Sequence, residues 1–170
     1  MDTLPSAVAW AGDAIEIIDQ TRLPDVCAIL RLTTAEAAVD AIRTLAVRGA
    51  PAIGGCGALA VVLGLDEARP ATREDALAAL DQVAARVGSA RPTAVNLSWA
   101  MGRVRDAAAR EATPAAMRAR ALLEAQRIVD MPRGPRRRFA ALRGARAHAS
   151  RRVSPPAPRH RAPGPRPTRG

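Results

Sequence analysis

The chain has 170 residues with 26 basic and 16 acidic side chains, and its formal net charge is +10. The excess lies at one end, because residues 133–169 supply 12 of the basic residues and no Asp or Glu follows Asp130. Residues 1–130 therefore hold 14 basic and 16 acidic groups, a net charge of −2, which argues against a basic nucleic-acid-binding domain. A body of this size is enough for one domain with a single core.

The N-terminal residues and the longest apolar stretch predict a cytoplasmic protein without a membrane partner. Residues 1–5 have neither the basic segment nor the apolar run of a signal peptide. The longest apolar stretch, residues 52–65, has 14 residues with four glycines, which is too short to span a bilayer. Cys27 and Cys56 have no metal-binding or redox spacing, so we expect both to stay reduced.

The first thirty or so residues predict a small antiparallel sheet. Apolar residues alternate over 8–10 and 15–18 on either side of a Gly12-Asp13 turn, which is the pattern of a hairpin with one buried face. A third strand is predicted from Val26 to Leu32.

Two helices are predicted next. Thr33 and Glu36 fit a capping box, and the helix that follows carries apolar residues at helical spacing through Leu45. Pro51 suits the first turn of a second helix, where its missing N–H is not needed. The glycines of this second helix each cost up to about 1 kcal/mol relative to alanine, which is tolerable if another backbone must come close.

Three further helices complete the predicted body. The first begins at Thr72 and ends at Gly88, the second runs from Arg91-Pro92 to about Glu111, and the last follows Thr113-Pro114. The predicted fold class is α+β, with a small N-terminal antiparallel sheet followed by a bundle of about five helices, within a domain of residues 1–130.

Residues 131–170 predict a disordered tail rich in Arg and Pro, because apolar residues there are sparse and have no period. GC-rich DNA read out of frame encodes such a composition, so we expect a frameshift near codon 130, with a genuine basic extension as the alternative. The positive charge of this tail also allows a less favoured function, which is the binding of nucleic acid through the tail. We rank it last because Phe139 alone is available there for stacking on bases.

Two arginines precede prolines at predicted helix starts, Arg48 before Pro51 and Arg91 before Pro92. A cation at the positive end of a helix dipole is unfavourable by itself, so the placement makes better sense with an anion between the two side chains. The Gly49 and Ala50 amides could point at phosphate oxygens, and the guanidinium groups could add charge-assisted hydrogen bonds. The alternative is a pair of ordinary surface arginines on connecting loops.

Three segments in order strongly resemble the N-terminal domain of the methylthioribose-1-phosphate isomerase family, over about residues 7–130. They are Asp19-Gln20-Thr21-Arg22-Leu23-Pro24, Val47-Arg48-Gly49-Ala50-Pro51-Ala52-Ile53-Gly54 and Arg91-Pro92-Thr93-Ala94-Val95-Asn96-Leu97, with Trp10 before the first and Trp99 after the last. This family of aldose–ketose isomerases in methionine salvage is related to regulatory subunits of a translation initiation factor. The resemblance implies that Arg48, Gly49, Ala50 and Arg91 bind 5-methylthioribose 1-phosphate.

The same resemblance implies that the enzyme opens the sugar ring and moves hydrogen from C2 to C1 without a metal or nucleotide cofactor. The family assigns this step to a Cys in a Thr-His-Cys-Asn segment and to an Asp, both in a Rossmann-like C-terminal domain that has no counterpart in these 170 residues. Neither Cys27 nor Cys56 stands in such a segment, and Cys56 is expected to be a packing residue.

We therefore expect a fragment with no catalytic residue of its own and little isomerase activity alone, from a protein that forms a homodimer at full length. The alternative is a non-catalytic sugar-phosphate-binding or regulatory protein of the wider initiation-factor-2B-like family.

Overall fold

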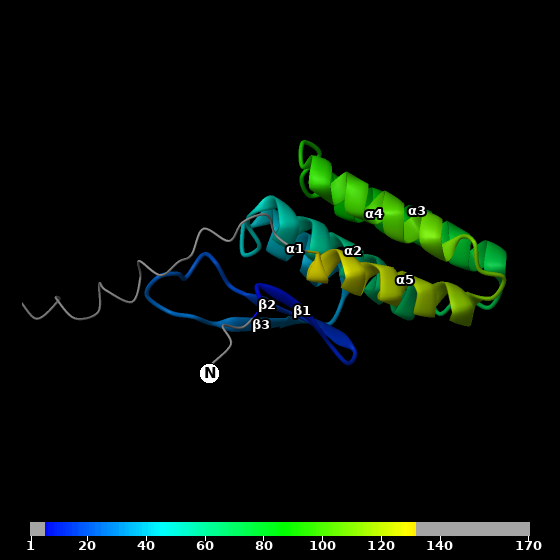
Figure 1. Ribbon diagram of the computed structural model, residues 1–170, viewed down its shortest axis with the longest axis horizontal. Helices are drawn as coiled ribbons and strands as arrows, with labels where there is room; N and C mark the ends of the chain where they lie inside the picture. The colour runs from blue at the N-terminus through cyan, green and yellow to red at the C-terminus, as the bar shows by residue number, and fades with distance from the viewer. Residues whose placement is uncertain (1–5, 132–170) are drawn as a thin grey trace, which may run out of the picture. The chain divides into compact units, whose positions relative to one another are not determined.

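The computed structural model describes residues 6–131, which form three strands followed by five helices (Figure 1). The predicted α+β class and the order of its elements are confirmed. The tail predicted for residues 131–170 lies outside the described residues, except for Met131. The elements are β1 (Val8–Ala11), β2 (Ala14–Ile18), β3 (Ile29–Leu32), α1 (Ala35–Arg43), α2 (Ala50–Ala68), α3 (Arg73–Ser89), α4 (Val95–Ala108) and α5 (Pro114–Asp130).

The sheet is antiparallel with the strand order β1-β2-β3, and β2 supplies most of its buried face. Ile15 and Ile17 are buried, and Ile17 stands opposite Val8 of β1. The third strand begins at Ile29 and not at Val26 as predicted. Val26 instead ends a turn, in which its N–H donates to the carbonyl of Arg22 at 2.9 Å.

Helix α1 starts one residue later and ends earlier than the sequence predicts. Thr34, not Thr33, is the N-cap, and its hydroxyl accepts from the N–H of Ala37 at 3.1 Å, so the predicted pairing of Thr33 with Glu36 is wrong. Leu45 lies beyond the helix at a φ of +64°, in the left-handed region, and is 43% exposed. The chain reverses there, which takes Leu45 off the apolar face that its spacing predicted.

Helix α2 runs through the centre of the domain, in contact with the four other helices and with β1 and β2. Residues 52–65 are all buried. Its 19 residues and mean hydropathy of 1.3 are compatible with a membrane span by length and composition, but 78% of the apolar window is buried inside the protein. That burial is what the central helix of a packed core requires.

The glycines of α2 lie where other helices come close, as predicted. A Cβ on Gly54 would stand 3.1 Å from the backbone oxygen of Asn96 in α4. A Cβ on Gly64 would overlap the side chain of Val83 in α3. Small residues therefore set the spacing between α2 and its neighbours.

The later helices differ from the predictions mainly at their ends. Thr72 and Asp75 form the expected capping box at the start of α3, and α5 begins at Pro114 after Thr113. Helix α4 begins at Val95, because residues 91–94 form a turn in which the N–H of Ala94 donates to the carbonyl of Arg91 at 2.9 Å.

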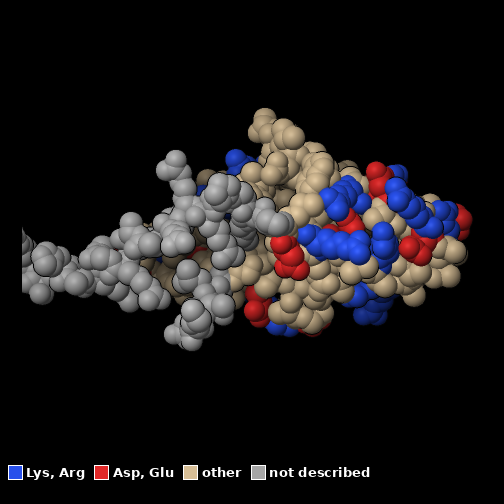
Figure 2. Space-filling view, viewed as in Figure 1, with Lys and Arg blue, Asp and Glu red and all other residues tan. Residues whose placement is uncertain are grey.

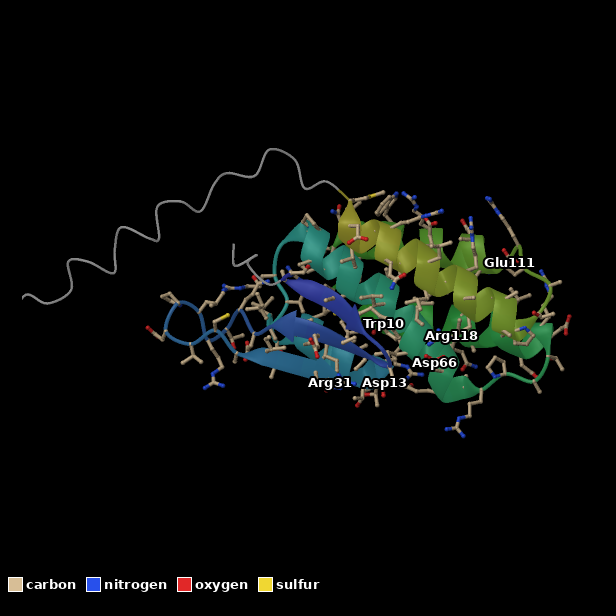
Figure 3. The ribbon with its side chains drawn as sticks, turned by 60° about the horizontal axis from the view of Figure 1, so that its bottom comes forward. Trp10, Asp13, Arg31, Asp66, Glu111 and Arg118 are labelled. Carbon is tan, nitrogen blue, oxygen red and sulfur yellow. The ribbon has the colours of Figure 1, made fainter. Side chains whose placement is uncertain are left out.

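An ion pair and an aromatic ring join the sheet to two of the helices. Arg118 of α5 donates from Nε and Nη2 to the two carboxylate oxygens of Asp66 in α2, both at 2.7 Å. Its guanidinium lies 6.0 Å from the centre of the Trp10 ring in β1, and the three side chains lie together in Figure 3. The hydrogen bond that Arg118 donates to the Asp66 carboxylate is the main cause that raises the pKa of Arg118.

Candidate functional site

The first part of the predicted phosphate site lies at the N-terminus of α2. Arg48 ends the connection from α1, Gly49 is the N-cap, and Ala50 is the first helical residue, all of them exposed. Gly49 has a φ of +87°, which a residue with a side chain rarely adopts. No side chain caps this helix end, so its first N–H groups are open to an acceptor from outside.

The second part, Arg91, lies in the turn before α4 and is half-buried. The N-terminus of α4 also has no side-chain cap, since Ala94 occupies that position. Because Gly54 packs against Asn96, the starts of α2 and α4 are neighbours at one end of the bundle. Among residues 6–131, no carboxylate lies within 4.0 Å of the guanidinium of Arg48 or Arg91.

A third segment contacts the Arg48 loop directly. Nη2 of Arg48 donates to the carbonyl of Gln20 at 2.6 Å, and Nε2 of Gln20 donates to the carbonyl of Arg48 at 3.3 Å. The backbone N–H of Gln20 also donates to Ala46 at 3.0 Å. Gln20 is not among the site residues predicted from the sequence. Its place in the motif Asp19-Gln20-Thr21-Arg22-Leu23-Pro24 is the signal that could have indicated it.

Asp19 fixes the turn that carries Gln20. It is 8% exposed, and one carboxylate oxygen accepts from the hydroxyl of Thr21 at 2.6 Å and from the Thr21 N–H at 3.0 Å. The side-chain hydrogen bond from Thr21 is the main cause that lowers the pKa of Asp19 below its usual value. The charged form of Asp19 is therefore the one that holds this turn.

Replacing Thr21 with valine should raise the pKa of Asp19 toward its usual value, because the hydroxyl donor is lost while the backbone donor remains. A carboxyl whose pKa is lowered by folding stabilises the fold above its unfolded pKa, and this contribution is lost as the pH falls through the folded value. Carbon NMR of the Asp19 carboxyl between pH 2 and 6 measures the change. The control is Thr44→Val, which removes a hydroxyl bonded to the Asp40 carbonyl and should leave the Asp19 titration unchanged. An unchanged pKa of Asp19 in Thr21→Val would show that the Thr21 hydroxyl is not the main cause of the lowered value.

The two cysteines lie in opposite environments. Cys56 is fully buried in α2, and burial raises the pKa of its thiol to about 12, which confirms its predicted packing role. Cys27 is exposed in the loop before β3. Among the described residues, no three His, Cys, Asp or Glu side chains lie together as ligands for a metal ion.

A thiol reagent should therefore label Cys27 in the folded protein and leave Cys56 unlabelled until the protein unfolds. The measurement is a time course with Ellman's reagent at pH 8 with and without denaturant. Cys27→Ser is the matched control and should remove the fast phase. Two equally fast thiols in the native protein would show that Cys56 is accessible.

A groove of about 620 Å³ lies between α4 and α5, and it does not include the predicted phosphate site. Side chains of Trp99, Arg103, Arg110, Arg120, Glu124 and Arg127 line it. No side chain in this groove was predicted as a site residue. The signal that could have indicated them is the run of arginines in the last two predicted helices.

Comparisons with known proteins agree with the motifs. Residues 46–142, more than half of the chain, match the model of the initiation factor 2 subunit family. The methylthioribose-1-phosphate isomerase of Thermosynechococcus vestitus is 50% identical over 107 residues, which are 63% of this chain and 30% of that protein. The enzyme of the same name from Methylobacterium nodulans is 46% identical over 119 residues, 70% of this chain and 31% of that protein.

Two solved structures share the fold. Subunit delta of the translation initiation factor eIF-2B from A. fulgidus matches with a TM-score of 0.69 and 34% identity over 72% of this chain and 36% of that one. The 5-methylthioribose 1-phosphate isomerase from Pyrococcus horikoshii OT3 matches with a TM-score of 0.69 and 27% identity over 74% of this chain and 36% of that one. The chain thus spans about a third of the length of its relatives, and it belongs to the initiation factor 2 subunit family.

Proposed function

We propose that this chain is the sugar-phosphate-binding part of a methylthioribose-1-phosphate isomerase. The observation that carries the proposal is the pair of uncapped helix starts, α2 and α4, which lie side by side with Arg48 and Arg91 next to them. The names of the curated relatives support the identity of the sugar phosphate, 5-methylthioribose 1-phosphate. Within residues 6–131, neither guanidinium group has a carboxylate oxygen within 4.0 Å.

Each part of the site would have a separate role. The first N–H groups of α2, with Gly49 and Ala50, would donate to the phosphate oxygens, since a helix N-terminus favours negative charge. Arg48 would add a charge-assisted hydrogen bond through the N–H groups that Gln20 does not occupy. Arg91 would bind the same dianion from the α4 side. The phosphate would hold C1 of the sugar in place while the rest of the ring stays open to other groups.

The reaction needs more than this site offers. Moving hydrogen from C2 to C1 requires a group that takes and returns a proton or supports hydride transfer at those carbons. Cys56 is buried with a thiol pKa of about 12, and Cys27 lies on the exposed loop after the Gln20 turn. We propose that the 170-residue chain binds the substrate without turning it over, in the cytoplasm, and that relatives supply catalysis from the remaining two thirds of their length.

The test is a titration of the 170-residue chain with 5-methylthioribose 1-phosphate, followed by calorimetry and by NMR of the backbone amides. Saturable binding that shifts the Gly49 and Ala50 amides, with no ketose product after overnight incubation, is the expected result. Absence of binding at millimolar substrate would refute the phosphate site. Formation of the ketose would refute the proposed lack of catalysis while leaving the site intact.

A second candidate is a regulatory protein that binds a sugar phosphate without catalysis. The likeness to the A. fulgidus subunit delta, at 34% identity, favours this candidate. The two functions differ in their requirement for a catalytic partner. Restored turnover on adding the complementary part of an isomerase relative would favour the enzyme, and a stable partner without turnover would favour regulation.

A further inference from the structure

The groove between α4 and α5 carries an excess of positive charge on a mildly acidic body. Four arginines and two carboxylates line it, a formal charge of +2, whereas residues 1–130 together carry −2. Figure 2 shows basic side chains over the helical end of the domain, with acidic side chains among them. The charge of the groove is therefore complementary to an acidic ligand. The charged residues are Arg103, Asp106, Arg110, Arg120, Glu124 and Arg127.

Some of the arginines in the groove are paired with a carboxylate and others are not. Glu124 is 4% exposed in the wall, where Nε of Arg103 donates to one carboxylate oxygen and Nη1 of Arg127 donates to the other at 3.3 Å. Among residues 6–131, Arg110 and Arg120 have no carboxylate within 4.0 Å. The free positive charge is thus concentrated at the end of the groove where α4 finishes and α5 begins.

An exposed aromatic ring lies at the opposite end. Trp99 is 47% exposed, and the guanidinium of Arg103 lies 5.4 Å from the centre of its ring. Val95, one turn earlier in α4, is 78% exposed. Tryptophan and arginine are the residue types that dominate binding energy at protein interfaces.

Gly102 lies in the groove, in the middle of α4. A Cβ built on Gly102 meets nothing within 4 Å, whereas Cβ atoms on Gly54 and Gly64 of α2 would press on neighbouring helices. Glycine is unfavourable in a helix interior, and no contact within the described residues explains it here. A glycine at this position leaves room for a second backbone to approach α4.

We propose that the α4–α5 groove binds an acidic amphipathic helix of a partner polypeptide. Along α4, which ends at Ala108, the groove extends from Ser98 to Ala107, about 14 Å or two and a half helical turns. The groove between two packed helices is the kind of surface into which a third, amphipathic helix packs. The partner's backbone would lie over Gly102, an apolar side chain would cover Trp99, and its carboxylates would meet Arg110 and Arg120.

The test uses the full 170-residue chain and a fluorescein-labelled 14-residue helical peptide of Ala, Leu and Glu, with Leu at one end of its apolar face and Glu at the other. Fluorescence anisotropy measures the affinity. Two protein variants alter the groove: Gly102→Leu fills it, and the pair Arg110→Ser and Arg120→Ser removes its free charges. Each should weaken binding at least tenfold, as should replacing Glu by Gln in the peptide.

The matched controls place the same changes elsewhere. Ala85→Leu adds the same side chain on the exposed face of α3, and Arg43→Ser with Arg86→Ser removes two charges outside the groove. Both should bind within twofold of the unaltered chain. Circular dichroism should show Gly102→Leu melting no lower than the unaltered chain, because its side chain meets open space.

Three results would overturn the proposal. The first is absence of saturable binding up to millimolar peptide. The second is equal loss of affinity in the control and groove variants, which would indicate attraction to arginines anywhere on the chain. The third is self-association of the chain that Gly102→Leu abolishes, since the occupant would then be a second copy.

Discussion

Alanine at Gly64 is expected to lower the free energy of unfolding by about 1 to 2 kcal/mol, although alanine is the better helix former by about 1 kcal/mol. Its Cβ would overlap both γ-methyl groups of Val83, which is 3% exposed and held between α2 and α3. A β-branched side chain has few alternative rotamers, so the two helices would have to separate. Urea unfolding followed by circular dichroism measures the change, and Gly64→Val should lower the stability further.

The matched control is alanine at Gly102, which lies in a helix of the same bundle but has open space around the position of a Cβ. This change should raise the free energy of unfolding by up to about 1 kcal/mol, because only the helix propensity changes. Changes of opposite sign in the free energy of unfolding, a decrease for Gly64→Ala and an increase for Gly102→Ala, would support close packing around α2. A stabilised Gly64→Ala protein would contradict it.

Replacing Arg48 with glutamine should weaken binding of 5-methylthioribose 1-phosphate at least tenfold. Hydrogen bonds to charged groups contribute about 1.5 to 3 kcal/mol, and glutamine keeps a polar side chain but loses the charge and the paired donors. The exposed position of Arg48 predicts little effect on the melting temperature. Calorimetric titration measures the affinity, and thermal unfolding of the same samples checks the fold.

Arg43→Gln is the control for the Arg48 change. Arg43 is exposed at the end of α1, where its Nη1 pairs with Asp40 at 2.9 Å. The control variant therefore also loses one positive charge, at a position shortly before Arg48 in the sequence. Its affinity for the sugar phosphate should remain within twofold of the unaltered chain. Equal losses in the two variants would show that general positive charge, and not the start of α2, attracts the ligand.

Local sequence signals identified every element, but they located element ends less well. Thr72 with Asp75 and Thr113 with Pro114 determine helix starts through contacts within one turn, so the sequence is sufficient there. The end of α1 was placed too late because Leu45 has helical spacing, while its left-handed backbone removes it from the helix. Periodicity cannot reveal such a reversal.

The candidate site was predicted in part. Arg48, Gly49, Ala50 and Arg91 stood out because an arginine before a helix start is electrostatically unusual, and their role in binding stays a prediction. Gln20 was not named, since its two hydrogen bonds with Arg48 join residues 28 positions apart. Such a pairing exists only after the sheet and α2 have come together.

The sequence by itself determined the composition boundary near residue 130, the α+β class and the family motifs, because charge, turn chemistry and apolar period are local properties. Tertiary structure decided which side chains meet. It placed Asn96 against Gly54, so that two helix starts separated by some forty residues became neighbours. It also formed the α4–α5 groove, whose charge and free space arise from two helices packed together and from neither helix alone.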